Sequence, residues 1–188
     1  MTYKVPTAST TDRRAMKVGS GLNVASGVVS TQVVALFDQA YFYDTTIQTN
    51  PVGGAINTIT YNSAAVNVGI TLVGGVGGSA IQVSKTANYN VQISLQIDKS
   101  DSGSDIADFW ILRNGIVPYP ATNSEITLVG PTSVLLGVWG YLLALNANDT
   151  IQVVWQALDT SIRLLSQPAK VGPVRPATPC VRVTIVQL

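Results

Sequence analysis

The side chains that most often carry enzyme chemistry are almost missing from this chain. The sequence contains no histidine, one cysteine, Cys180, and one glutamate, Glu125. Acid–base catalysis, nucleophilic catalysis and transition-metal binding depend mostly on these residue types. No Gly-x-Ser-x-Gly motif marks a serine nucleophile either. We therefore expect a protein that is not an enzyme, with no catalytic residues and no cofactor.

Four carboxylates nevertheless lie close together in the sequence. Asp98, Asp101, Asp105 and Asp108 share the stretch 98–108, and carboxylate oxygens are the ligands that calcium prefers. The spacing differs from that of an EF-hand loop, which needs an acid at its twelfth position. We expect a solvated loop between strands here, and a calcium site at the apex of a trimer is the alternative.

The single cysteine limits how the fold can be held together. Cys180 opens the apolar stretch 180–186, which we interpret as a strand rather than as the setting of a reactive thiol. One cysteine cannot form a disulfide within the chain. The fold must therefore depend on packing and on assembly.

Charge is scarce along the whole chain. Charged residues make up 11% of the 188 residues, against about 25% in a typical soluble domain. Because solubility normally depends on a charged surface, the shortage indicates that other subunits cover much of this one. A secreted β-protein with an uncharged polar surface is the alternative.

Strand patterns separated by turn residues run from residue 33 to the end. The clearest is 89–97, in which apolar and polar residues alternate as in a half-buried antiparallel strand. Asn114-Gly115 and Asn148-Asp149 are tight-turn signals. We predict an all-β, antiparallel jelly-roll sandwich. The expected strands are 33–42, 56–61, 68–73, 80–84, 89–97, 108–113, 125–129, 133–145, 150–157, 161–165 and 180–186.

Three of these segments are apolar on both faces. They are 109–112, 134–145 and 151–155. A strand in an isolated sandwich normally has one polar face, so a second apolar neighbour must cover the other. We expect that neighbour to be another subunit, and a long covering loop is the alternative.

Residues 1–32 are predicted to form an N-terminal arm ahead of a jelly-roll domain at 33–188. The arm is rich in Thr, Ser, Gly and Arg and has too few apolar residues for a core. We expect it to lie against a neighbouring subunit. The stretch 16–30 resembles one repeat of the triple β-spiral shaft of viral fibres, although a glycine-rich hairpin looks similar.

Basic residues gather at both ends of a chain whose net charge is only +1. The arm carries Lys4, Arg13, Arg14 and Lys17, and four bases but no acid occur from residue 163 onward. Such ends fit an acidic partner surface, either a capsid shell or nucleic acid, or they are simply solvated. Of the two partners we expect the shell.

The N-terminus lacks the apolar stretch of a secretory signal, and no segment has 18 uninterrupted apolar residues. We therefore expect synthesis in the host cytoplasm and no contact with a membrane.

Five short motifs occur in an order that resembles structural proteins of phages and environmental viruses with trimeric TNF/C1q-like jelly rolls. They lie at 42–50, 81–96, 109–115, 145–155 and 175–185. The chain departs from the pattern at Asn148-Asp149, where relatives carry Gly-Asp, and at Asn88-Tyr89, where they carry Gly-x-Tyr. Asn tolerates a positive φ, so both turns can survive.

The resemblance implies a homotrimer on the capsid exterior that acts as a decoration or cement protein. The major capsid protein or neighbouring virion proteins would then be its partners. A receptor-binding tip or a head or tail fibre, recognising host glycans or proteins through loops such as 98–108 and 117–124, is the alternative. The aromatic residues expected in the core or at the trimer interface are Tyr89, Trp110, Trp139, Tyr141 and Trp155.

Overall fold

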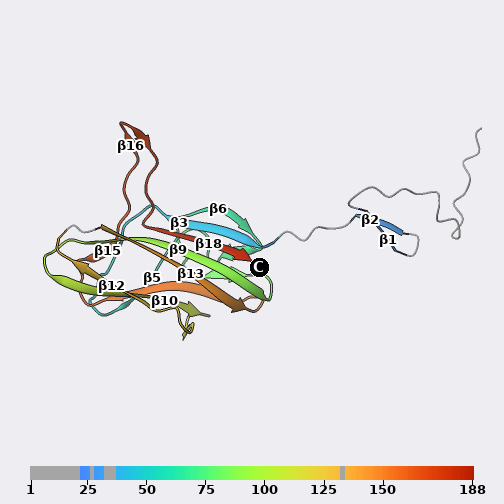
Figure 1. Ribbon diagram of the computed structural model, residues 1–188, viewed down its shortest axis with the longest axis horizontal. Helices are drawn as coiled ribbons and strands as arrows, with labels where there is room; N and C mark the ends of the chain where they lie inside the picture. Colours follow the sequence, from blue (N-terminus) through green and yellow to red (C-terminus); the bar gives the residue numbers. More distant parts are fainter. Residues whose placement is uncertain (1–21, 26–27, 32–36, 132–133) are drawn as a thin grey trace, which may run out of the picture. The chain divides into compact units, whose positions relative to one another are not determined.

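The computed structural model describes residues 22–25, 28–31, 37–131 and 134–188, and every regular element in these ranges is a β-strand (Figure 1). The chain divides into two units, 1–36 and 37–188. In the first unit, β1 (Leu22–Ala25) and β2 (Val28–Thr31) form an antiparallel hairpin. The rest of the predicted shaft-like repeat and the arm's four basic residues lie outside the described residues.

The second unit consists of two antiparallel sheets. The β9 sheet has the order β4-β15-β9-β18-β3-β6, and β13 pairs with β9 as well. The β14 sheet has the order β11-β10-β14-β8-β7, with β12 on β10 and β5 on β14. The strands of the β9 sheet are β3 (Gln39–Asp44), β4 (Gln48–Thr49), β6 (Ser63–Val68), β9 (Ala87–Lys99), β13 (Val134–Leu145), β15 (Ile162–Leu164) and β18 (Val181–Gln187). Those of the β14 sheet are β5 (Ile56–Thr58), β7 (Ile70–Leu72), β8 (Ile81–Val83), β10 (Ser104–Arg113), β11 (Val117–Pro118), β12 (Ser124–Val129) and β14 (Thr150–Ala157).

The path of the chain between the sheets is that of a jelly roll. From β9 the chain passes to β10 and β12 in the other sheet, returns to β13, crosses again to β14 and ends on β18. As a result β9 lies between β13 and β18, and β14 lies beside β10. The predicted antiparallel jelly-roll sandwich is confirmed.

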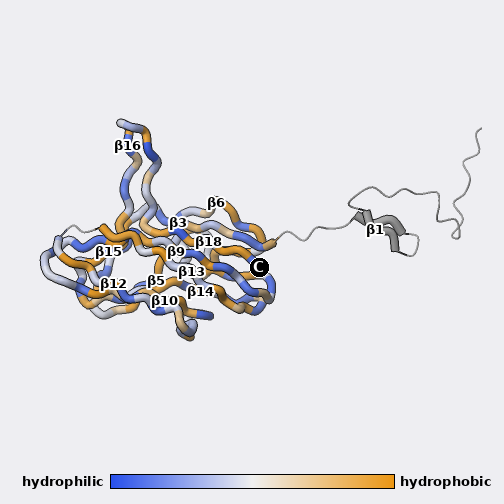
Figure 2. Tube along the Cα trace, viewed as in Figure 1, coloured by the Kyte–Doolittle hydropathy of each residue, from blue (hydrophilic) through white to orange (hydrophobic). Residues whose placement is uncertain are grey.

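The core lies between the two sheets and follows from the alternation along the strands. In β9, Tyr89, Val91, Ile93, Leu95 and Ile97 point inward and are buried, and the polar residues between them point outward. The largest fully buried side chains include Trp155, Tyr61 and Phe42. Figure 2 shows apolar positions along strands of both sheets.

Several predicted boundaries were wrong: the expected strand 56–61 ends at Thr58, the expected strand 33–42 begins at Gln39 within the described residues and runs to Asp44, and two further segments differ for identifiable reasons. The expected strand 68–73 is broken by Gly69, whose φ of 68° lets the chain leave β6 in one sheet and enter β7 in the other. A Cβ at this glycine would overlap the carboxylate of Asp38. The expected loop 98–108 is mostly strand, because β9 runs to Lys99 and β10 begins at Ser104.

The turns predicted from asparagine have the expected geometry. Asn114 has a φ of 53° and Asn148 one of 70°. The buried carboxylate of Asp149 accepts hydrogen bonds from the Asn146 backbone N–H at 2.7 Å and from the Asn114 side chain at 2.9 Å. It also pairs with Arg113 at 2.5 Å. This network fixes two neighbouring turns at one end of the sandwich.

A hairpin that the sequence did not predict projects from the sandwich, as Figure 1 shows at β16. It is formed by β16 (Lys170–Val171) and β17 (Val174–Arg175), and paired backbone hydrogen bonds between Gln167 and Thr178 close its base. Strands of two residues are too short to leave an alternating pattern. No helix within the described ranges has the length and apolarity to cross a membrane.

Candidate assembly interface

The outer face of the β9 sheet carries almost no charge. Three rows of outward side chains cross β13, β9, β18, β3 and β6, and among their fifteen positions Arg182 is the only charged residue. The rows are Val138, Ser94, Arg182, Tyr43 and Ser63; Gly140, Gln92, Thr184, Tyr41 and Val66; and Leu142, Asn90, Val186, Gln39 and Val68. We call these residues, together with Leu136 at the neighbouring outward position of β13, the β9 outer face.

The β13 end of this face is the most apolar part of it. Leu136, Val138 and Leu142 lie on alternate positions of β13 and expose 59%, 64% and 73% of their surface. β13 pairs with β9 along its whole length and with no other described strand, so it is an edge strand. Monomeric proteins usually avoid an exposed apolar edge, because it promotes association. An assembled partner would cover it.

A cluster of aromatic rings supports this edge from inside. The ring of Phe109 lies 5.5 Å from that of Trp139 and 6.1 Å from that of Trp155, centroid to centroid. Trp139 packs over Gly137, where an added Cβ would overlap its ring. The cavity beside these rings has a volume of only about 10 Å³, so the sheets leave no room for a ligand there.

Tyr141 fixes β13 to the start of β12. Its hydroxyl donates to the Thr122 carbonyl at 2.9 Å and shares a hydrogen bond with the Ser124 hydroxyl at 3.1 Å. The outward positions of β13 are thereby held in place by a rigid inner face.

The five aromatic residues singled out from the sequence occupy three kinds of position. Tyr89 and Trp155 are buried in the core. Trp139 and Tyr141 are half-buried at the β13 edge. Trp110 is half-buried on the outer side of the β14 sheet, because its neighbours Phe109 and Ile111 point inward. None of the five belongs to the β9 outer face. Leu136, Val138 and Leu142 were not singled out from the sequence as individual residues, although they lie in the segment 134–145 that is apolar on both faces.

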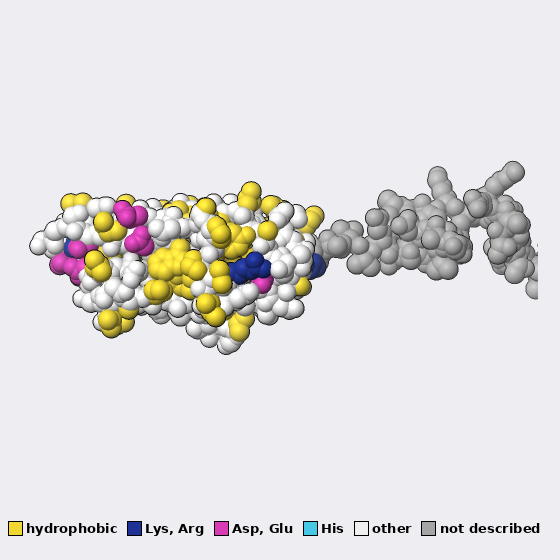
Figure 3. Space-filling view, turned by 90° about the horizontal axis from the view of Figure 1, so that it is seen from below, with side chains coloured by type: hydrophobic (Ala, Val, Ile, Leu, Met, Phe, Trp, Pro, Cys, Tyr) yellow, Lys and Arg dark blue, Asp and Glu magenta, His cyan; other side chains and the backbone are white. Residues whose placement is uncertain are grey.

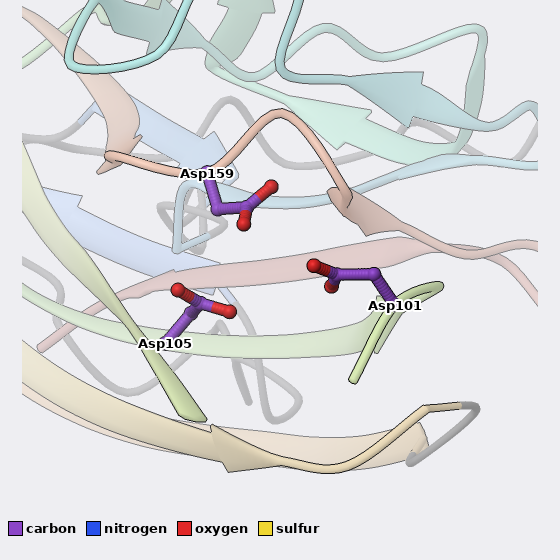
Figure 4. A group of neighbouring side chains, drawn as sticks. All are labelled: Asp101, Asp105 and Asp159. Carbon is purple, nitrogen blue, oxygen red and sulfur yellow. The ribbon is translucent and has the colours of Figure 1, made fainter. Parts of the chain in front are cut away.

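The predicted calcium ligands are not brought together as a set. Asp98 is bound by Arg163, whose Nε and Nη2 lie 2.9 and 2.6 Å from one carboxylate oxygen. Asp108 lies farther along β10, opposite Glu125. Only Asp101 and Asp105 meet, and Asp159 from the β14–β15 turn joins them (Figure 4).

A buried ammonium already pairs with two of the three carboxylates in that acidic cluster. The side chain of Lys99 is fully buried and pairs with both Asp101 and Asp105. Burial alone would lower the pKa of Lys99, but the hydrogen bonds it donates to the two carboxylates outweigh burial and raise that pKa. Hydrogen bonds from Lys99 and Ser161 lower the pKa of Asp101. The positive charge that a metal would supply comes from the chain itself.

Cys180 is unsuited to thiol chemistry. It is fully buried just before β18, and burial raises the pKa of its thiol to about 12. Reactive cysteines have lowered pKa values and partial exposure. Its role in the fold is packing.

No known protein family and no curated protein matches this sequence. Solved structures with a similar chain path include murine APRIL at pH 8.0, with a TM-score of 0.49 and 10% identity over 81% of this chain and 100% of that chain. The pH 5.0 structure of murine APRIL has a TM-score of 0.47 at 9% identity, with the same coverage of both chains. The globular domain of zebrafish complement 1qA has a TM-score of 0.49 at 10% identity, covering 81% of this chain and 98% of that chain. The jelly-roll assignment itself rests on the strand order and register described above.

Proposed function

We propose that this chain is a non-enzymatic structural protein of a virus particle, a homotrimer that decorates the capsid exterior and stabilises the shell. The order of its sequence motifs and the scarcity of charge support a virion protein that works through assembly. The jelly roll alone does not decide among functions, since the same fold serves many.

The β9 outer face is the observation that carries the proposal. It combines three exposed apolar side chains on β13 with a broad surface that has one charged residue. A surface of this composition resembles the core of a subunit interface, where charged residues are depleted. When such a face packs against a different surface of the next copy, three copies close into a ring if each is rotated by one third of a turn relative to its neighbour.

The N-terminal arm is the proposed contact with the shell. Lys4, Arg13, Arg14 and Lys17 give residues 1–32 a positive charge that the sandwich lacks. Three arms on one trimer would bind with an avidity that a single arm cannot reach. This arrangement separates trimer formation, in the sandwich, from capsid binding, in the arm.

Deleting residues 1–32 tests that separation. The truncated chain should elute as a trimer in size-exclusion chromatography with light scattering, and it should no longer sediment with purified capsids. The matched control replaces only the arm's four basic residues by alanine, which should weaken binding and make the remaining binding less sensitive to salt. Capsid binding that survives the deletion would contradict the role of the arm.

A receptor-binding tip is the second candidate function, and one observation favours it. The hairpin β16–β17 projects from the sandwich and exposes Val171 and Val174 by 94% and 85%. Saturable binding of the protein to host cells, lost on deletion of 169–176, would favour this function over decoration. Loop 98–108 gives it no support, because most of that segment is strand.

A further inference from the structure

The projecting hairpin carries positive charge that its own subunit does not neutralise. Lys170 lies directly opposite Arg175 across the hairpin, and both are exposed. Like charges in directly opposed positions destabilise a strand pair. Neither base has a carboxylate partner in the described part of the chain, and no acid follows Asp159 in the sequence. Both charges are therefore open to an acidic surface of a partner molecule.

The tip of the same hairpin is apolar. Val171 pairs with Val174 one step beyond the two bases, next to the turn, and both valines are almost fully exposed. Two opposed valines at the end of a projecting element bury nothing within their own subunit. Because successive residues of a strand point to opposite faces, the basic pair lies on one face of the hairpin and the apolar pair on the other.

The outer surface of β10 and β12 carries a pair of the opposite charge. Asp108 lies directly opposite Glu125, and neither forms an ion pair with a described residue. Asp108 accepts only a long hydrogen bond, 3.3 Å, from the Asn123 amide. Ile106, two residues before Asp108 on the same face of β10, is 48% exposed. Figure 3 shows acidic side chains next to a hydrophobic patch on the side that is seen from below.

The two surfaces cannot meet within one subunit. In Figure 1 the hairpin points away from the sandwich on one side, and β10 lies at the opposite side. A contact between them must join two copies, and it would be heterologous, since different surfaces of the two copies take part. Such a contact can repeat from copy to copy.

We propose that the hairpin 170–175 of one copy docks on the β10–β12 surface of another copy. Lys170 and Arg175, on one face of the hairpin, pair with Asp108 and Glu125. Each pair of like charges is destabilising in the isolated subunit and is neutralised by the other in the contact. This contact is separate from the β9 outer face, so it links neighbouring trimers into an array, and it does not depend on the virion role.

A zero-length cross-link tests the contact directly. A carbodiimide joins an amine to a carboxylate only when the two touch. In a mixture of normal and nitrogen-isotope-labelled full-length protein, mass spectrometry should find Lys170 joined to Asp108 or Glu125 between chains of different isotope composition. The absence of these links, or links only within one chain, would overturn the proposal.

Charge exchange gives an independent measurement. Lys170→Glu with Arg175→Glu, and separately Asp108→Lys with Glu125→Lys, should each weaken association between trimers at least about tenfold at low salt. The chain with all four substitutions should regain association to within about threefold of the wild type. The contact would be overturned if the variant with all four substitutions associated as weakly as either double variant. It would also be overturned if the double variants associated like the wild type. Light scattering of the same samples measures whether the trimer persists. Loss of the trimer in these variants would count against the β9 outer face as the trimer interface.

Discussion

Leu142→Asp places a charge in the most exposed apolar position of the β9 outer face. Leu142 exposes 73% of its surface in the single subunit and contributes nothing to the core. The substitution should therefore leave the subunit folded while it disrupts the trimer. The same change in an exposed residue away from this face should have neither effect.

The magnitude follows from the surface that a trimer would bury. Fully burying a leucine side chain contributes about 1.5–3 kcal/mol, so the exposed 73% corresponds to about 1–2 kcal/mol per subunit. A carboxylate without a partner in that interface adds a cost of about 2 kcal/mol or more. The sum, about 3–4 kcal/mol per subunit contact, weakens each contact about a hundredfold to a thousandfold.

Sedimentation equilibrium over a range of concentrations measures the effect, and urea unfolding of the dissociated subunit checks the fold. Val76→Asp is the matched control, because Val76 is 74% exposed in the turn between β7 and β8 and does not belong to the β9 outer face. A Leu142→Asp trimer within threefold of the wild-type affinity would refute the assignment of the interface. If Leu142→Asp and Val76→Asp weakened the affinity between subunits equally, the added negative charge itself, and not its position, would be the cause.

Three further predictions concern the fold that supports this face. Trp155→Ala removes a buried ring next to Phe109 and should lower the free energy of unfolding by about 3–5 kcal/mol in urea titrations; a loss below 1 kcal/mol would contradict its place in the core. Gly137→Ala should lower the melting temperature and cost about 1–3 kcal/mol, because the new methyl group overlaps the Trp139 ring, whereas Gly140→Ala meets open space and should cost little; equal effects would refute the packing. Burial would raise the pKa of Asp149, but its hydrogen bonds outweigh burial and lower that pKa, so its stabilising contribution is present above pH 3.8 and disappears as the pH falls through the lowered pKa. The stability gap between the wild type and Asp149→Asn should therefore narrow on acidification below that value, and a gap that widens would contradict the network.

The sequence was sufficient for the class of fold and for the strands that carry a clear alternation. The segment 89–97 predicted the inward residues of β9, and asparagine at 114 and 148 predicted turns with a positive φ. These features are local, because periodicity and turn chemistry depend on residues that are close together in the sequence. The segment 134–145, which is apolar on both faces, was likewise predicted as a strand from neighbouring residues, and it forms the exposed edge strand β13.

Features that depend on distant residues could not be predicted in the same way. The partners of Asp98 and Asp101 are Arg163 and Ser161, which register between β9 and β15 brings together. Asp159 joined the acidic cluster from a turn that no spacing rule connects to 98–108. The hairpin β16–β17 was missed because each strand has only two residues.

Cryo-electron microscopy of virus particles to which this chain binds tests the proposed decoration role most directly. We expect trimers distributed over the capsid lattice, with the β9 outer face buried between the three subunits and the arm against the shell. Density for the chain only at a tail or a single vertex, or as monomers with β13 exposed to solvent, would contradict it.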